Sequence, residues 1–264
     1  MIRVSELYVY PVKSCSGSSV QEATVTATGF DLDRRWMVVD GDGVFLTQRT
    51  HPRMALVGVR AERDRLLIDA PGVAEFEVSF AEPGGSVVEV KVWKDTCRAG
   101  DEGAEAAAWF SDFLGFRARL VRLAGDHARP VGGTAARSGD WVSFADGFPF
   151  LLLSQGSLDG LNQRLAAPLP MNRFRPNIVV SGCEAHAEDE WKRVKIGELP
   201  FRVAKPCARC VVTTTDQATG DRDSEPLRTL ATYRMQNQEI NFGQNLIHEG
   251  LGRLRVGDEV SVLS

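Results

Sequence analysis

The chain has 264 residues, of which 43% are hydrophobic and 25% are charged, so it can bury the core of one large domain or two ordinary ones. Its net charge of −4 argues against the basic surface of a general nucleic-acid-binding protein. The five cysteines are an odd number, which argues against a complete disulfide framework. No charged-then-apolar leader opens the chain, and no apolar run approaches the roughly 20 residues that span a bilayer. We therefore expect a cytoplasmic protein with reduced thiols and no membrane segment.

The first third of the chain predicts short strands separated by turns. The Asp-Gly-Asp-Gly run at 40–43 is a strong hairpin signal. Strands at this spacing favour a barrel or a sandwich. The apolar and β-branched runs that predict them cover residues 4–12, 20–27, 36–39, 54–59, 66–68, 76–80 and 87–93.

The rest of the chain mixes helices with further strands. A helix is predicted over 102–114, where Ala106, Trp109 and Phe113 recur at helical spacing, and Gly115 would end it. Residues 124–146 predict a long loop. The predicted fold class is thus mostly β with a few helices (α+β). We divide the chain into two domains, 1–119 and 120–264. Helices are also predicted over 154–165 and 227–235, and strands over 148–153, 178–180, 194–196, 199–203, 211–215, 239–247 and 256–263.

Two cysteines carry the strongest chemical signal. In Lys205-Pro206-Cys207-Ala208-Arg209-Cys210 they stand three positions apart, with an arginine between them, before a predicted strand. Thiolates bind soft metals, and a neighbouring cation favours the thiolate form. The question is therefore what the sulfur atoms bind.

Four interpretations of this pair remain open on the residues alone. A thioredoxin-like redox pair would normally precede a helix, whereas β-branched residues follow Cys210 here. Cys183 and His186 could complete a structural zinc site with Cys207 and Cys210. Buried cysteines often merely pack. The fourth interpretation is a single thiolate ligand to a metal cofactor that other groups hold.

Cations at the ends of predicted strands favour the fourth interpretation. Lys13 and Ser14 end the first strand, Arg34 precedes the strand at 36–39, and Arg173 and Arg175 precede the strand at 178–180. A guanidinium binds phosphate bidentately, and an ammonium binds it as a point charge. The sequence therefore indicates an anionic ligand that is bound by side chains from both halves of the chain.

At this point the chain resembles a known family. Five ordered segments, at 10–15, 33–36, 148–162, 174–182 and 207–216, are similar to the MOSC family with its N-terminal β-barrel domain. The likeness is strongest to the mitochondrial amidoxime-reducing components and the bacterial YcbX-like proteins. It implies an N-terminal β-barrel-like domain packed on a C-terminal MOSC β-barrel domain. It also implies a reductase of amidoximes, hydroxylamines, N-hydroxylated bases and N-oxides that depends on the molybdenum cofactor, molybdopterin with Mo.

The resemblance also implies roles for individual residues. Cys210 would be the catalytic residue and the protein ligand to molybdenum, whereas Cys207 would not be a ligand. Ser154, at a helix start, would add a hydroxyl and backbone N–H groups for the cofactor's phosphate. Asp146 and Asp189 are weaker candidates near the substrate. The implied cofactor-binding residues are Lys13, Ser14, Arg34, Ser154, Arg175, Asn177 and Arg209.

Partners follow from the same resemblance. The chain contains no Cys-x₄-Cys-x₂-Cys motif of a ferredoxin domain, so we expect a separate electron-donor protein of the ferredoxin or flavoprotein type. The substrate would be a small N-hydroxylated molecule. A cysteine-persulfide sulfur carrier that uses Cys210 on the same fold is the alternative function.

Overall fold

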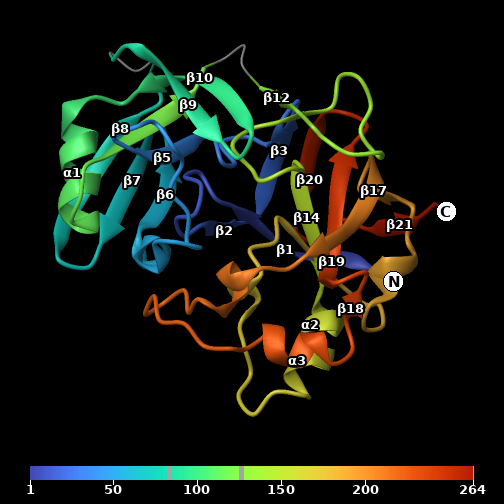
Figure 1. Ribbon diagram of the computed structural model, residues 1–264. Helices are drawn as coiled ribbons and strands as arrows, with labels where there is room; N and C mark the ends of the chain where they lie inside the picture. The colour runs from blue at the N-terminus through green and yellow to red at the C-terminus, as the bar shows by residue number, and fades with distance from the viewer. Residues whose placement is uncertain (82–84, 125–127, 264) are drawn as a thin grey trace.

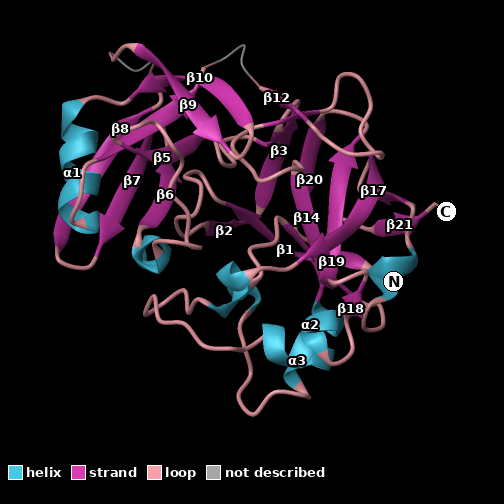
Figure 2. Cartoon of the chain, viewed as in Figure 1, coloured by secondary structure: helices cyan, strands magenta, loops and turns pink. Residues whose placement is uncertain are grey.

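The structure is a computed structural model that describes residues 1–81, 85–124 and 128–263. Figure 1 shows two β-rich lobes, one with α1 on its outer side and the other with the long strands β17 and β19. Strands dominate both lobes, and helices are few (Figure 2). The expected fold class is confirmed. Within the described ranges, no helix combines the length and the apolar character needed to cross a bilayer.

The first lobe contains two antiparallel sheets, one with the order β6-β7-β8 and one with the order β5-β11-β10-β9. The predicted helix forms as α1, and it buries Trp109, Phe110 and Phe113 against this lobe's core. It ends at Gly115, which has a φ of 82° in the left-handed region. The elements are β5 (Trp36–Asp40), β6 (Gly58–Glu62), β7 (Arg65–Ala70), β8 (Val73–Ser79), β9 (Val87–Val92), β10 (Asp95–Asp101), α1 (Ala104–Leu114) and β11 (Ala118–Leu123).

The second lobe is built on a large sheet with the order β2-β1-β15-β14-β19-β17-β16-β21. The short strand β18 adds to β19, β20 pairs with β3 and β3 with β4, and β12 pairs with β13. The elements are β1 (Arg3–Val9), β2 (Ser18–Val20), β3 (Glu22–Thr26), β4 (Gly29–Phe30), β12 (Arg129–Pro130), β13 (Trp141–Val142), β14 (Phe150–Ser154), α2 (Gln155–Asn162), β15 (Ile178–Ser181), β16 (Arg193–Ile196), β17 (Leu199–Ala208), α3 (Leu227–Ala231), β18 (Met235–Gln236), β19 (Glu239–His248), β20 (Gly252–Arg255) and β21 (Val260–Val262).

The N-terminal strands join the second lobe. Strand β1 pairs antiparallel with β15, with Leu7 opposite Ile178, and β3 pairs with β20. Leu7 and Phe30 share a hydrophobic core with Phe150 and Phe201. The predicted boundary between residues 119 and 120 therefore assigns β1 and β3 to one domain and their partner strands β15 and β20 to the other. As a result, the end of β1 lies beside the start of β15, where the predicted cations meet.

The structure contradicts the predicted secondary structure at several places. Residues Val211–Thr214 form a 3-10 helix instead of a strand, because Thr213 and Thr214 donate their hydroxyls to the carbonyls three residues earlier. A 3-10 helix at Pro52–Leu56, with a proline in its first turn, replaces the start of a predicted strand. The predicted loop at 124–146 contains the β12–β13 hairpin. Helix α3 is shorter than predicted.

Candidate functional site

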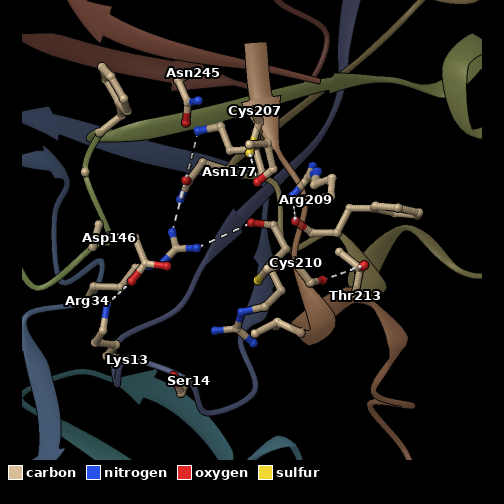
Figure 3. Close-up of a pocket in the computed structure, with 18 of the residues that line it drawn as sticks. Lys13, Ser14, Arg34, Asp146, Asn177, Cys207, Arg209, Cys210, Thr213 and Asn245 are labelled. Carbon is tan, nitrogen blue, oxygen red and sulfur yellow. Dashed lines mark hydrogen bonds and ion pairs between the residues drawn. The ribbon is translucent and has the colours of Figure 1, made fainter. Parts of the chain in front are cut away.

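A cavity of about 180 Å³ draws its walls from segments far apart in the sequence. Figure 3 shows Lys13, Ser14 and Arg34 on one side and Arg209 and Cys210 on the other. The cavity brings together Cys210 and every predicted cofactor-binding residue except Ser154. Its lining includes Lys13, Ser14, Arg34, Arg49, Asp146, Arg173, Arg175, Asn177, Cys207, Arg209, Cys210, Thr213 and Asn245.

Three of the lining residues have an unusual backbone conformation. Ser14, Arg34 and Arg175 have φ angles of 66°, 49° and 53°, in the left-handed region that non-glycine residues seldom adopt. Each of them lies outside the strands, in a segment that connects two of them. Strained backbone of this kind persists where the surrounding structure requires it and is concentrated at functional sites.

Arg34 and Asn177 tie the end of β1 to the start of β15. Nη1 of Arg34 donates hydrogen bonds to Oδ2 of Asp33 (2.6 Å) and Oδ1 of Asn177 (3.0 Å), and Nη2 donates to the carbonyl of Arg175 (3.3 Å). The guanidinium carbons of Arg34 and Arg175 lie 4.3 and 4.4 Å from the centroid of the Tyr10 ring. Burial raises the pKa of Tyr10 to about 12. The phenol is therefore neutral at physiological pH, and the two cations rest on an uncharged ring.

Several buried donors in this cavity lack a partner. Among the described residues, Nη1 of Arg175, Nη2 of Arg209 and Nε of Arg173 are buried without a hydrogen-bond acceptor. The other nitrogens of Arg209 are used, since Nε donates to the carbonyl of Phe242 (2.7 Å) and Nη1 to that of Phe174 (3.0 Å). Burial lowers the pKa of Arg175 to about 10. Unpartnered buried donors are rare and costly, so three at one cavity indicate that an anionic ligand completes it.

Lys13 is already paired. Its ammonium donates to the carbonyl of Phe144 (2.7 Å) and forms an ion pair with Oδ1 of Asp146. Arg49 Nη2 lies 3.1 Å from the other carboxylate oxygen of Asp146. Burial lowers the pKa of Lys13. Burial alone would raise the pKa of Asp146, but the charges of Lys13 and Arg49 outweigh it and hold that pKa well below its usual range. Asp146 is therefore a permanent carboxylate at neutral pH.

The two cysteines of the motif both line the cavity but differ in environment. Cys210 follows β17, and its carbonyl accepts a hydrogen bond from the Thr213 hydroxyl (3.0 Å) at the start of the 3-10 helix. The guanidinium of Arg49 interacts with the Cys210 side chain. Burial raises the pKa of the Cys207 thiol, which favours its protonated form.

Two of the predicted site residues have side chains that the fold uses elsewhere. Ser154 is fully buried; it caps α2 by accepting a hydrogen bond from the Ser157 N–H (3.0 Å) and donates to Oε2 of Glu188 (2.9 Å). Asp189 forms an ion pair with Arg234 (2.6 Å) and accepts a hydrogen bond from Gln244 (2.8 Å). The structure therefore does not bring Ser154 or Asp189 to the cavity.

The proposed zinc ligands do not converge. Cys183 packs against the core of the large sheet. The ring of His186 lies 5.8 Å from that of Tyr233, measured between centroids, whereas Cys207 and Cys210 line the cavity. Over the part of the chain that the structure describes, no group of three or more His, Cys, Asp or Glu side chains could hold a metal ion. The structural-zinc alternative is therefore wrong.

Sequence reasoning missed Arg49. It lies in a polar segment between β5 and β6 and has no motif around it. Its partners Asp146 and Cys210 come from the other lobe, so only the tertiary structure reveals its place. Asn245, in contrast, belongs to the Phe242–Asn245 stretch, where Gly243 adopts a φ of 81°. The glycine is the signal that the sequence offers at this stretch. Its structural reason is close packing, because a Cβ on Gly243 would lie 2.7 Å from the Leu152 carbonyl oxygen.

Comparisons with known proteins decide the family. Residues 1–117 match the MOSC N-terminal beta barrel domain, and residues 139–261 match the MOSC domain. Mitochondrial amidoxime-reducing component 1 of Mus musculus is 37% identical, over 98% of this chain and 82% of that protein. This chain belongs to the MOSC family. The Homo sapiens component 1 is 35% identical over 98% of this MOSC protein and 82% of its own length. Mitochondrial amidoxime reducing component 2 of Rattus norvegicus is 36% identical, over 97% of this chain and 82% of that protein.

The MOSC family is associated with the molybdenum cofactor, and the residues of this MOSC protein fit such a group. A pterin cofactor with a phosphate tail needs convergent hydrogen-bond donors, which Arg173, Arg175 and Arg209 leave unused. A molybdenum centre needs a soft protein ligand, which the Cys210 sulfur at the same cavity can supply.

Proposed function

We propose that this MOSC protein is an oxidoreductase that uses the molybdenum cofactor to reduce N-hydroxylated compounds. The observation that carries the proposal is that a partly exposed cysteine and several unpartnered buried guanidinium donors share one cavity. A phosphate-bearing, sulfur-ligated cofactor satisfies both features at once. The similarity to proteins named amidoxime-reducing components supports the reaction class.

Each residue has a distinct task in this proposal. Cys210 would ligate molybdenum, and Arg49 would hold the Cys210 side chain in place. The free donors of Arg175 and Arg209 would bind the phosphate, while Arg34 fixes Asn177 and the Arg175 backbone beneath it. When bound, the cofactor supplies the two-electron redox chemistry. The remaining cavity residues shape the space that the substrate enters.

The overall reaction would cleave the N–O bond of the substrate. Two electrons and two protons would convert an amidoxime into an amidine and water. Because the pKa of Asp146 is lowered, it stays ionised at neutral pH and is suited to accept hydrogen bonds rather than to donate the protons. The electrons would come from a separate donor protein of the ferredoxin or flavoprotein type, in the cytoplasm. Amidoximes, hydroxylamines, N-hydroxylated bases and N-oxides are the proposed substrates.

Elemental analysis of two serine variants tests the proposal. Protein produced in a host that makes the cofactor should contain molybdenum and should reduce benzamidoxime anaerobically with a chemical reductant. Cys210→Ser should abolish turnover and lower the molybdenum content, whereas Cys207→Ser should keep both. Equal molybdenum content in wild type and Cys210→Ser would contradict the assignment of the ligand. Sulfane sulfur on Cys210 without any molybdenum would favour the sulfur-carrier alternative.

A further inference from the structure

A second cavity, of about 610 Å³, adjoins the first. The two share Asp146, Gly147 and Phe148 as lining residues, so the second cavity lies directly beside the one that contains Cys210. This volume lies within the range of pockets that bind small organic ligands. The residues that line the second cavity include Trp93, Lys94 and Lys205.

Trp93 occupies an unusual place in this cavity. It is the first residue of the two-residue turn between β9 and β10, because Val92 pairs with Asp95. Its φ of 55° is left-handed, a conformation that glycine or asparagine normally supplies in such turns. A bulky aromatic residue is disfavoured there. The side chain is nevertheless 48% exposed, so burial in the core does not explain the tryptophan.

The indole is held in a fixed orientation at the boundary between the two cavities. Its Nε1–H donates to Oδ1 of Asp146 (3.3 Å), and the Arg49 guanidinium carbon lies 4.6 Å from the ring centroid. The ring of Phe45 packs edge-on against it, 4.8 Å away between centroids. The same Arg49 and Asp146 form the wall of the first cavity, so the position of the indole is coupled to that of the Cys210 site.

The walls of the second cavity suit a planar apolar group. Besides Trp93 they present Val131, Val142 and Phe148. The charged Arg129 behind them is already satisfied, since it pairs with Asp95 (2.9 Å) and donates to the Ser143 carbonyl (3.1 Å). An aromatic ring can stack on the exposed indole while a polar substituent points towards Cys210.

We propose that Trp93 and this second cavity form a subsite for the aromatic ring of an aryl amidoxime, and that Trp93 determines the preference for aryl over alkyl substrates. The inference rests on the proposed function, which assigns the reacting N–O group to the Cys210 cavity. Benzamidoxime and acetamidoxime differ only in the ring, so the ratio of their kcat/KM values isolates the subsite.

Trp93→Asn is the informative variant, because asparagine tolerates the left-handed turn and removes the indole. In the molybdenum-loaded protein the benzamidoxime-to-acetamidoxime ratio should fall by about tenfold. Trp141→Ala is the matched control, since Trp141 is also exposed (40%) but lines neither cavity; it should leave the ratio unchanged. An unchanged ratio in Trp93→Asn would overturn the subsite and leave the reductase function standing.

A binding measurement separates the two proposals. In saturation-transfer NMR, the ring protons of benzamidoxime should receive clearly less magnetisation from Trp93→Asn than from wild type or Trp141→Ala. Equal transfer in all three proteins would overturn the subsite. Binding that depends on Trp93, in a molybdenum-loaded protein that reduces neither compound, would overturn the reductase function alone.

Discussion

Gln48 and Gln217 exchange two side-chain hydrogen bonds of 3.2 Å across the two lobes. Gln48 is fully buried and also donates to the Ser14 carbonyl (2.8 Å). Arg222 donates to the carbonyls of Gln48 and Arg49. The segment that follows Cys210 is thus hydrogen-bonded to the segment that carries Arg49. These bonds fix the position of Arg49 relative to Cys210.

Gln217→Ala should therefore lower the stability of the protein and its activity without removing the cofactor. We expect the free energy of unfolding to fall by about 1–3 kcal/mol, because the buried Gln48 side-chain oxygen loses the donor that Gln217 provides. The kcat/KM should fall several-fold because Arg49 is held less firmly, while molybdenum content stays near that of wild type. Urea unfolding, elemental analysis and steady-state kinetics measure these quantities. Gln236→Ala, at an exposed strand position, is the control, and equal stability of the two variants would contradict the idea.

Arg175→Met should make the cofactor-free protein more stable. Burial lowers the pKa of Arg175 to about 10, so the ionised form is disfavoured in the folded state at every pH below that value. This penalty disappears as pH rises through the folded and then the unfolded pKa. A buried charge without a full set of partners is often replaced by an apolar side chain with a gain in stability.

The measurement is thermal unfolding of cofactor-free protein, together with molybdenum content. We expect the Tm of Arg175→Met to rise by at least about 2 °C while molybdenum content falls sharply. Arg119→Met is the control, because Arg119 pairs with Asp101 (3.2 Å) outside the cavity and should leave molybdenum content unchanged. A lower Tm together with full molybdenum content would show that Arg175 is structural.

Asp146→Asn should destabilise the protein in a pH-dependent way. The pKa of Asp146 is lowered in the folded state by Lys13 and Arg49, against the opposing effect of burial. The contribution of the carboxylate is therefore complete above its unfolded pKa of about 4, and it is lost as pH falls through the lower folded pKa.

Urea titrations from pH 7 to pH 3 would measure this dependence. At pH 7 the variant should lose about 1 kcal/mol, a modest value because the Asp146 side chain is half-exposed, and the gap should narrow below pH 4. The exposed Asp112→Asn change on α1 should show no such trend. A gap that widened in acid would reverse the inferred sign.

Alkylation of the cysteines should follow burial and ligation. Cys15 is fully buried, and burial raises its pKa to about 12, so iodoacetamide at pH 8 should leave it unmodified in the folded protein. Cys210 is partly exposed and should react in cofactor-free protein but be protected once molybdenum is bound. Peptide mass spectrometry measures each site. Equal modification of Cys210 with and without the cofactor would argue against ligation.

The sequence by itself determined the mostly-β fold, helix α1 and the family, because these depend on local periodicity and on ordered motifs. It also identified Lys13, Arg34, Arg175, Asn177 and Cys210 as cavity residues, since cations and a thiol at strand ends are visible without coordinates. It did not show that β1 joins the sheet of the second lobe, because strand pairing across most of the chain leaves no local pattern.

Only the tertiary structure decided which polar side chains pair with one another and which remain free for a ligand. Ser154 and Lys13 are both polar residues at strand ends, yet Ser154 is used by Glu188 and by the cap of α2, while Lys13 pairs with Asp146. Arg49 and Trp93 have no motif and gained their places from partners in the other lobe. The physical reason is that composition fixes which donors and acceptors exist, whereas packing fixes which of them meet and which stay free to bind a ligand.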